Sequence, residues 1–262
     1  MTDYDPTVPS VAKVYDALQD GKDNFESDRE AADAIRGIAE DGKRAAHDNR
    51  AFLGRTVRFL AREAGIRQFL DIGTGLPAAN NTHEVAQAIA PESRIVYVDN
   101  DPIVLSHAQA LLTSTPQGTC DYLDADARDP EKILAAASGT LDFGQPVAVM
   151  LLAVLHFIED PVAHEIVSIL TESMPAGSHM VISHASADQA TPDEIRAINE
   201  IYKGTGTPIF LRTRDEITTF FDGLELEEPG VTDINEWRNP EYEPARTIGY
   251  GLSLIHISEP TR

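Results

Sequence analysis

The chain has 262 residues, which is long enough to bury one well-filled α/β core with appended elements and excludes a miniprotein. Its 43 acidic and 21 basic side chains give a formal charge of −22, which disfavours attraction to nucleic acid or to an anionic membrane. A single cysteine, Cys120, excludes an intramolecular disulfide, and no apolar run is long enough to cross a bilayer. We therefore expect a cytoplasmic globular protein without nucleic-acid or membrane partners.

Apolar residues at helical spacing predict helices in the first 67 residues, interrupted by a polar break at residues 21–24. From residue 68, short apolar runs rich in β-branched residues alternate with helical stretches, which is typical of a parallel sheet flanked by helices. The predicted strands are Gln68–Ile72, Arg94–Asp99, Thr119–Asp124, Val147–Leu152 and His179–His184. The predicted helices are near Ala78–Ala90, Pro102–Leu112, Pro130–Ala137, Pro161–Met174 and Thr191–Tyr202.

The pattern is weaker after residue 214. It predicts a short helix at Glu216–Phe221, an antiparallel edge strand opening at Leu224–Leu226, and a polar loop over Pro229–Arg246. The alternation in Ser253–Arg262 is typical of a strand, but this segment also resembles the translation of a sequencing adaptor. We therefore interpret residues 252–262 as a non-native tail and expect the natural sequence to diverge near Leu252.

A glycine-rich turn follows the first predicted strand. Gly73 and Gly75, with Thr74 between them, allow a tight turn, and the helix that follows offers free backbone N–H groups to a ligand. The spacing also satisfies a relaxed dinucleotide fingerprint, so an NAD-dependent enzyme is one interpretation. Asp71 favours another, because its carboxylate would repel a pyrophosphate but suits the sulfonium and ammonium of S-adenosylmethionine. A helix-capping Asp71 is the alternative.

Acidic residues also end the next two predicted strands. Asp99 lies 24 residues after Gly75, where a carboxylate can accept hydrogen bonds from ribose hydroxyls in either cofactor. Asn100 follows it, and Asp101 is interpreted as the N-cap of the next helix. At the third strand, we expect the Asp126 carboxylate and the Ala127 backbone N–H to bind an adenine ring.

Two histidines follow the fourth and fifth predicted strands, on the side of the sheet where a substrate is expected. His156 is the preferred candidate for a general base, with His184 as the alternative and a structural role possible for both. Methyl transfer to an oxygen or nitrogen nucleophile can also proceed by positioning alone, without a base. His179 and His184 lie five apart on one predicted strand, hence on opposite faces, and no carboxylate lies at ligand spacing from either, so we predict no metal.

The chain resembles the actinobacterial S-adenosyl methyltransferase family, which was formerly a domain of unknown function. The resemblance covers about residues 8–250. Its motifs are Pro9–Asp16, Gly21–Phe25, Asn49–Leu53, Gln68–Pro77, Asn81–Ala86, Tyr97–Pro102 and Ala153–Phe157. The Ser253–Arg262 segment departs from the glycine-rich, basic ending that this resemblance leads us to expect.

The resemblance implies a class I methyltransferase fold: a Rossmann-like, mostly parallel α/β sheet with an antiparallel edge strand and helices on both faces. It implies an N-terminal helical cover over residues 1–67 and a cofactor-binding domain over residues 68–251. S-adenosylmethionine would be bound by Asp71, Gly73, Gly75, Asp99 and Asp126. Cofactor contacts are also predicted for Tyr15 in the cover, Thr74 and Asn100. They are predicted for Lys22 as well, whose turn either holds the methionine end of the cofactor or is only an ordered polar connection.

The prediction is an S-adenosylmethionine-dependent methyltransferase that acts on an oxygen or nitrogen nucleophile of a small molecule. Two alternatives remain open at this point. One is an NAD-dependent oxidoreductase, and the other is a non-catalytic protein that binds S-adenosylmethionine as a regulator.

Overall fold

The computed structural model describes residues 5–38, 42–111, 113–242 and 251–256. Its α-helices are α1 (Val11–Leu18), α2 (Glu26–Ile38), α3 (Gly42–Arg62), α4 (Thr82–Ile89), α5 (Pro102–Leu111), α6 (Pro130–Ala137), α7 (Asp160–Glu172), α8 (Pro192–Gly204) and α9 (Arg214–Thr218). Two 3₁₀ helices are η1 (Leu155–Phe157) and η2 (Thr219–Phe221). The strands are β1 (Gln68–Ile72), β2 (Arg94–Asp99), β3 (Thr119–Asp124), β4 (Ala148–Leu152), β5 (His179–His184), β6 (Glu225–Leu226), β7 (Thr232–Asp233) and β8 (Gly251–His256).

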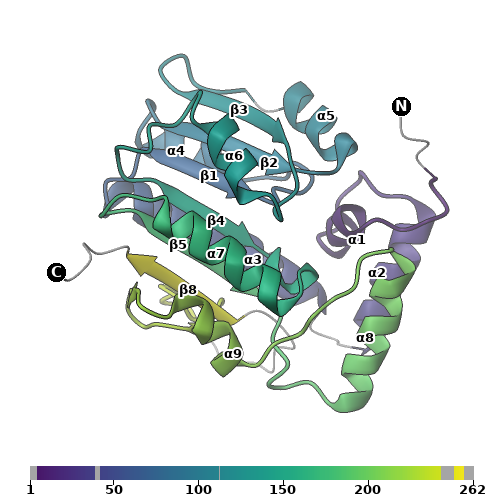
Figure 1. Ribbon diagram of the computed structural model, residues 1–262. Helices are drawn as coiled ribbons and strands as arrows, with labels where there is room; N and C mark the ends of the chain where they lie inside the picture. Colours follow the sequence, from purple (N-terminus) through teal and green to yellow (C-terminus); the bar gives the residue numbers. More distant parts are fainter. Residues whose placement is uncertain (1–4, 39–41, 112, 243–250, 257–262) are drawn as a thin grey trace.

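The strands form one sheet in the order β3-β2-β1-β4-β5-β8-β6, and Figure 1 labels the strands from β3 to β8 in this order. β7 also pairs with β8. The first five strands in this order are parallel, whereas β8 runs antiparallel to β5 and pairs His184 with Gly251. β6 pairs antiparallel with β8, at the residues where the sequence predicts a short strand. β8 includes part of the segment interpreted as a tail, and residues 257–262 lie outside the described residues.

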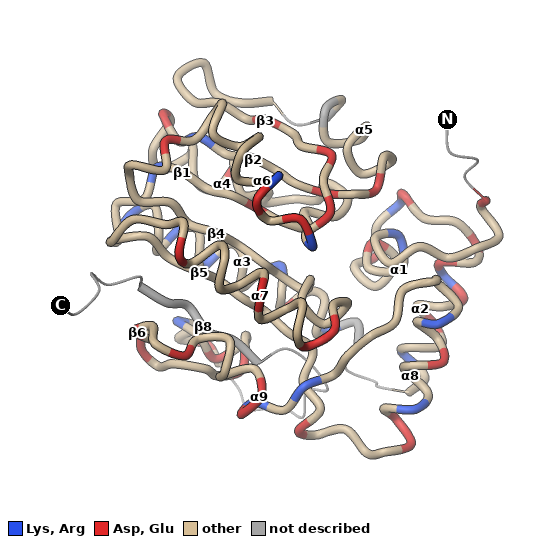
Figure 2. The backbone as a smooth tube through the Cα atoms, in the orientation of Figure 1, with Lys and Arg blue, Asp and Glu red and all other residues tan. Residues whose placement is uncertain are grey.

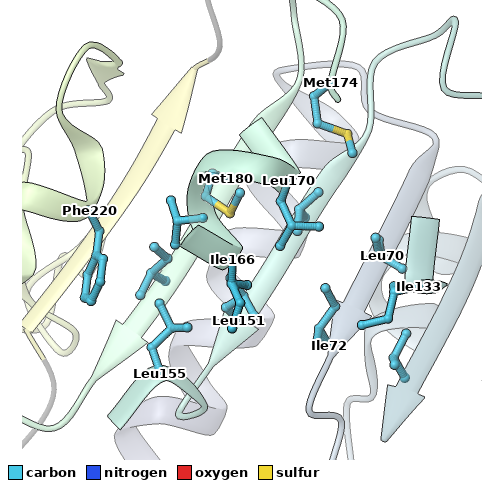
Figure 3. Close-up of a cluster of buried hydrophobic side chains, with 14 of the residues drawn as sticks. Leu70, Ile72, Ile133, Leu151, Leu155, Ile166, Leu170, Met174, Met180 and Phe220 are labelled. Atoms are coloured by element: carbon cyan, nitrogen blue, oxygen red, sulfur yellow. The ribbon is translucent and has the colours of Figure 1, made fainter. Parts of the chain in front are cut away.

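Buried side chains cover both faces of the sheet, because β1, β4 and β5 are buried along their whole length. On one face, a cluster from these strands packs against α6, α7 and Phe220 of η2 (Figure 3). On the other face, Phe52, Val57 and Leu60 of α3 pack against Phe69 of β1. α3 therefore belongs to the sheet layers, and the predicted cover of residues 1–67 is divided between this helix and the two before it.

A third cluster lies apart from the sheet. Val14 and Leu18 of α1 and Ile35 of α2 pack against Ile201 and Tyr202 of α8. In Figure 1 these three helices stand together beside the carboxyl ends of the strands. We call α1, α2 and α8 the cap. α1 and α2 precede the five parallel strands in the sequence, whereas α8 follows them. The sequence predicts a covering role for α1 and α2 but not for α8.

Several predicted boundaries differ from those observed. α4 begins at Thr82 and not near Ala78, because Asn80 has a positive φ of 61° and Glu84 accepts a hydrogen bond from the Asn81 N–H at 2.7 Å. The predicted polar loop after Pro229 includes β7 and carries Trp237 into the core, where its ring lies edge-on to Phe52 at 5.6 Å. Over the described residues, no helix is both long and apolar enough to span a membrane.

Candidate active site

A cavity of about 490 Å³ lies where the carboxyl ends of β1 to β4 face the cap. The sheet order reverses between β1 and β4, and open parallel sheets hold their ligands at this crevice. The volume is in the range of small-molecule sites. The lining residues are 71–75, 99–101 and 125–128 after the first three strands, 152–154 and 156–158 after β4, 10–12, 15, 49, 50 and 53 from α1 and α3, and 202 and 205–208 from α8 and beyond.

The turn after β1 requires glycine at two positions. Gly73 has a φ of +75° and donates its N–H to the Val98 carbonyl at 2.8 Å. A Cβ at Gly73 would lie 2.3 Å from Val154 Cγ2, so a side chain would collide as well as strain the backbone. Gly75 has a φ of +66°, but a Cβ there would meet nothing within 4 Å. This turn brings the backbone close to the cavity.

Asp71 is buried at the end of β1 and accepts a hydrogen bond from the Thr82 hydroxyl at 2.6 Å. Burial raises the pKa of this carboxyl to about 6, while the Thr82 hydroxyl and the Arg50 guanidinium oppose the shift. Arg50 itself lines the cavity and donates to the Ala79 carbonyl and to Asn81 Oδ1. One carboxylate and one guanidinium therefore lie beside the glycine turn.

Asp99 ends β2 with both carboxylate oxygens held by backbone N–H groups. Oδ2 accepts from Gly75 at 2.9 Å, and Oδ1 accepts from Asp101 at 2.9 Å. Burial raises the pKa of Asp99, and these backbone bonds oppose it. Each oxygen retains a second lone pair that can accept from a ligand. Asp101 caps α5 through its bond to the Ile103 N–H at 2.8 Å, the role predicted for it.

The loops after β2 and β3 are joined at Asp126. Its Oδ2 accepts from the Asn100 amide at 3.3 Å, and its Oδ1 accepts from the Arg128 backbone N–H at 2.9 Å. Ala127 lies beside them on the cavity wall. Figure 2 shows acidic positions in these loops, on the side of the sheet that faces α1. Strand-end acids from β1, β2 and β3 thus meet at one cavity.

Hydrogen bonds connect the cap to the end of the sheet. The Asn49 amide, on α3, donates to the Tyr15 hydroxyl at 2.7 Å, and its Oδ1 accepts from the Ser183 hydroxyl at 2.7 Å. Ser183 Oγ in turn accepts from the Ala153 N–H at 2.9 Å. Ala153 has a φ of 58°, an uncommon conformation for a residue with a Cβ. A continuous polar chain therefore runs from the first cap helix to the turn after β4.

His156 lies buried in η1, on the cavity wall. Its Nδ1 accepts a hydrogen bond from the Ala185 N–H at 3.2 Å, so the neutral ring carries its proton on Nε2. Burial, followed by the nearby His184 and Arg212, lowers the pKa of His156 well below its usual range. This arrangement fits a hydrogen-bond donor better than the predicted general base, because the remaining nitrogen is already protonated.

His184, the alternative base, is outside the cavity lining among the described residues. Its Nε2 accepts from the Arg212 guanidinium at 2.6 Å, and its Nδ1 donates to the Ala185 carbonyl at 2.8 Å. Burial and the Arg212 charge lower its pKa to about 3. Arg212 also donates to the Leu155 and Ile158 carbonyls at 2.8 and 2.7 Å, which holds η1 in place. His184 therefore helps to position Arg212, which in turn holds η1.

Comparison with known proteins shows the family to which the chain belongs. The sequence profile described as "S-adenosyl methyltransferase" matches residues 1–252. The chain belongs to the S-adenosyl methyltransferase family. A DUF574 family protein from Streptomyces avermitilis is 41% identical, with a TM-score of 0.91, 96% of this chain covered and 98% of that one. A protein from Thermobifida fusca, provisionally described as a methyltransferase, is 38% identical, with a TM-score of 0.88 and coverages of 97% and 96%.

More distant structures share the fold. Human N-acetylserotonin methyltransferase in complex with S-adenosylmethionine is 15% identical, with a TM-score of 0.50, 95% of this chain covered and 66% of that one. No match was found among curated proteins. The class I fold, the cofactor S-adenosylmethionine and methyl transfer are confirmed, and neither an NAD-dependent oxidoreductase nor a non-catalytic binding protein is favoured. The profile match ends at residue 252, where we expect the natural sequence to diverge.

The residues of this S-adenosyl methyltransferase fit its cofactor. The glycine turn leaves a backbone cradle that a Cβ at residue 73 would fill, and Asp71 supplies negative charge beside it. Asp99 offers the acceptor oxygens that a pair of ribose hydroxyls needs. The guanidinium of Arg50, near Asp71, suits a carboxylate, so the two together match an amino-acid group. The roles of the single residues stay predictions.

Lys22 is the one predicted cofactor-binding residue that is not at the cavity. It is exposed in the connection between α1 and α2. That connection is held by Asp16, whose Oδ2 accepts from the Asp23 N–H at 3.0 Å and from the Asn24 amide at 2.8 Å. Gly21 is required because a Cβ there would lie 1.9 Å from Asp16 Oδ1. Of the two interpretations of this motif, the ordered polar turn fits the structure.

Apart from Tyr15, sequence reasoning assigned no role to the cavity residues that lie outside the loops after the strands. Asn49 and Arg50 belong to the motif Asn49–Leu53, which carried the family resemblance but received no role. Tyr202 and residues 205–208 had no local signal, because only the packing of α8 against α1 and α2 brings them to the cavity. A polar residue on the buried face of α3 was the signal that could have identified Asn49.

Proposed function

We propose that this methyltransferase acts on an oxygen or nitrogen nucleophile of a small molecule. The observation that supports this proposal is the cavity itself, which extends from the strand-end acids to the cap. When bound, the cofactor supplies an activated methyl group, whose carbon bonds to the acceptor lone pair as the sulfur–carbon bond breaks and its electrons stay on sulfur. The chain's own residues supply binding, orientation and exclusion of water.

In the proposed site, Asp99 accepts hydrogen bonds from the ribose hydroxyls, and Asp126 with the Ala127 N–H binds the adenine. Asp71 faces the ammonium of the cofactor's amino-acid group, and Arg50 binds its carboxylate. The support is the position of these side chains around the glycine turn and their charges. Thr74 and Asn100 line the same end and complete the wall.

The acceptor's proton leaves to water in this proposal, because His156 holds its own proton on Nε2 and has a lowered pKa. A base role for His156 requires that the His156→Gln variant loses turnover while it keeps its cofactor affinity. If turnover on an identified acceptor is unchanged, positioning accounts for the rate.

We also propose that the cap closes over the cofactor. Support comes from Tyr15, which lines the cavity while its helix packs against α8. The proposed closure differs from the predicted cover of residues 1–67, since it includes α8 and leaves α3 with the sheet. Hydrogen exchange of α1 and α8 should slow together when S-adenosylhomocysteine binds; slowing in α1 alone contradicts a joint cap.

The test of the function has a binding part and a turnover part. Calorimetry should detect saturable binding of S-adenosylmethionine and S-adenosylhomocysteine but not of NAD. Release of S-adenosylhomocysteine should then be measured with small hydroxy and amino compounds, and separately with protein and RNA as acceptors. Turnover on the macromolecules alone contradicts a small-molecule acceptor, and saturable NAD binding without S-adenosylmethionine binding contradicts the function as a whole.

A further inference from the structure

The part of the cavity wall formed by α1, by η1 and by α8 with the residues that follow it is aromatic. It meets the strand-end acids where Arg128, which pairs with Asp126, donates to the Phe157 carbonyl. Phe157 and Tyr202 lie with their ring centroids 5.4 Å apart and their planes at 54°, and Tyr15 lines the same cavity from α1. Tyr15 and Tyr202 also pack against the apolar cluster of the cap, which fixes where the rings stand. We call Tyr15, Phe157 and Tyr202 the aromatic end.

The elements that form this end contribute no charged side chain to the lining, and the Arg50 guanidinium on α3, which acts on Tyr15, is assigned in the proposed site to the cofactor's carboxylate. The lining residues contributed by α1, η1 and the segment from Tyr202 to Pro208 include no carboxylate, ammonium or guanidinium group. His156, the titratable ring in η1, is kept neutral by its lowered pKa. Arg128 reaches the Phe157 carbonyl at 2.9 Å, but its charge is paired with Asp126. An acceptor with a permanent charge would therefore find no counter-charge from these elements.

The aromatic end also offers hydroxyl groups. Burial raises the pKa of both Tyr15 and Tyr202, so both phenols stay protonated at neutral pH. Tyr15 is already engaged, because it accepts from the Asn49 amide at 2.7 Å. Among the described residues, none makes a hydrogen bond with the Tyr202 hydroxyl. A polar group in such surroundings gains from a partner that the ligand supplies.

We propose that the aromatic end binds an uncharged aromatic acceptor that carries a hydroxyl group. The acceptor's ring contacts Phe157 and Tyr202, and its hydroxyl makes a hydrogen bond with the hydroxyl of Tyr202. Aromatic rings pack best against each other in tilted or offset contacts, and the Phe157–Tyr202 pair already has such a tilt. This assignment rests on the proposed function and names the class of its acceptor.

The test is a titration of three probes into the protein saturated with S-adenosylhomocysteine. The probes are 2-naphthol, 2-naphthoate as the charge control, and decahydro-2-naphthol as a control of similar size without an aromatic ring. We expect 2-naphthol to bind at least about tenfold more tightly than either control. The assignment is overturned if 2-naphthol does not bind, if 2-naphthoate binds as tightly, or if the saturated alcohol does.

A variant then isolates the hydroxyl of Tyr202. Tyr202→Phe keeps the ring and should weaken 2-naphthol binding about five- to twentyfold, as expected for one lost hydrogen bond, with naphthalene binding unchanged. The matched control is Tyr122→Phe on β3, because Tyr122 is a half-buried tyrosine outside the cavity lining. It should change neither affinity. Equal loss for naphthol and naphthalene overturns the hydrogen bond to Tyr202.

Binding of S-adenosylhomocysteine separates this inference from the proposed function. If neither S-adenosylmethionine nor S-adenosylhomocysteine binds to the wild-type protein, the proposed function fails. If S-adenosylhomocysteine binds but the order of the probes is reversed, the function stands and only the acceptor class is wrong. If Tyr202→Phe weakens S-adenosylhomocysteine as much as 2-naphthol, Tyr202 belongs to the cofactor's end and the assignment is overturned.

Discussion

The two ends of the cavity are formed by different chemical groups from different parts of the fold. At the cofactor's end, backbone N–H groups and carboxylates from β1, β2 and β3 meet within a few residues of each strand end. At the aromatic end, side chains come from α1, η1 and α8, which are distant in sequence and belong to the cap or to a turn. In our proposal the parallel sheet therefore provides the cofactor's surroundings, and the attached helices select the acceptor.

The interactions that hold the two ends in place also differ between the sheet and the cap. The turn at the cofactor's end is held by hydrogen bonds within the sheet layers, such as Gly73 to Val98 at 2.8 Å. The aromatic end depends on the apolar cluster of the cap and on one polar chain through Asn49. Elements with few contacts to the main core open more readily. We expect substitutions at the cofactor's end to act on binding strongly and those at the cap to act more weakly.

The largest effect is expected from Gly73→Ala, with Gly75→Ala as its matched control. Both glycines have positive φ, which costs an alanine about 1–2 kcal/mol. Only the Cβ at residue 73 would also collide with Val154, at 2.3 Å. Gly73→Ala should abolish measurable cofactor binding and lower the melting temperature more than Gly75→Ala. Equal effects of the two variants would show that backbone strain alone matters.

A second effect concerns pH and comes from Asp71. Its pKa is raised to about 6 by burial, and the ammonium of a bound cofactor favours the ionised form. Affinity for S-adenosylhomocysteine should therefore be constant above about pH 7 and fall as pH drops through 6, by up to tenfold per unit. Asp99, whose pKa is also raised, adds to the fall at lower pH.

The control for this pH dependence is Asp71→Asn, which should bind less tightly at pH 8 and lose the step near pH 6. The raised pKa of Asp71 affects folding stability in the opposite direction to cofactor affinity. Between about pH 4 and 6 the folded state binds more protons at Asp71 than the unfolded state does, so this group's contribution to stability decreases as pH rises. An unchanged pH profile in Asp71→Asn would assign the step to another group.

The smallest effect is expected where the cap is attached to the sheet. Tyr15→Phe removes the hydroxyl that accepts from Asn49, and Ser183→Ala removes the donor on the other side of Asn49. Each should weaken S-adenosylhomocysteine binding about three- to tenfold, because one hydrogen bond of roughly 1 kcal/mol is lost. The double variant should lose less binding free energy than the two single losses added together, since both hydroxyls belong to the same hydrogen-bonded path through Asn49. Strict additivity in this double-mutant cycle would contradict a continuous connection.

The sequence predicts the cofactor's end far better than the aromatic end, for a physical reason. The strands β1, β2, β3 and β5 match their predicted bounds, and β4 differs by one residue. Continuous apolar runs define the buried strands β1 and β4, whereas the edge strand β3 is only half-buried. The acids that end them follow directly in sequence. By contrast, the contact of Tyr202 with the first cap helices joins residues nearly 200 positions apart, and no local pattern encodes it. The burial of Trp237 in a loop predicted as polar has the same cause.

His156 illustrates a further limit. Its position after β4, at the cavity, was predictable from the rule that ligands lie at the carboxyl ends of parallel strands. Its protonation was not, because it depends on the Ala185 N–H and on Arg212, which come from later elements. Sequence can thus place a titratable group near a site, whereas its chemistry depends on the groups that the fold packs around it.

The most direct test of the cofactor's surroundings is a calorimetric titration of the wild-type protein and Asp99→Ala with S-adenosylhomocysteine. The wild-type protein should bind it saturably. In Asp99→Ala, the loss of an ionised acceptor and of its bond to Gly75 should cost roughly 1.5–3 kcal/mol, or about ten- to a hundredfold in affinity. An unchanged dissociation constant in a folded Asp99→Ala variant would contradict the proposed position of the ribose and the division of the cavity described above.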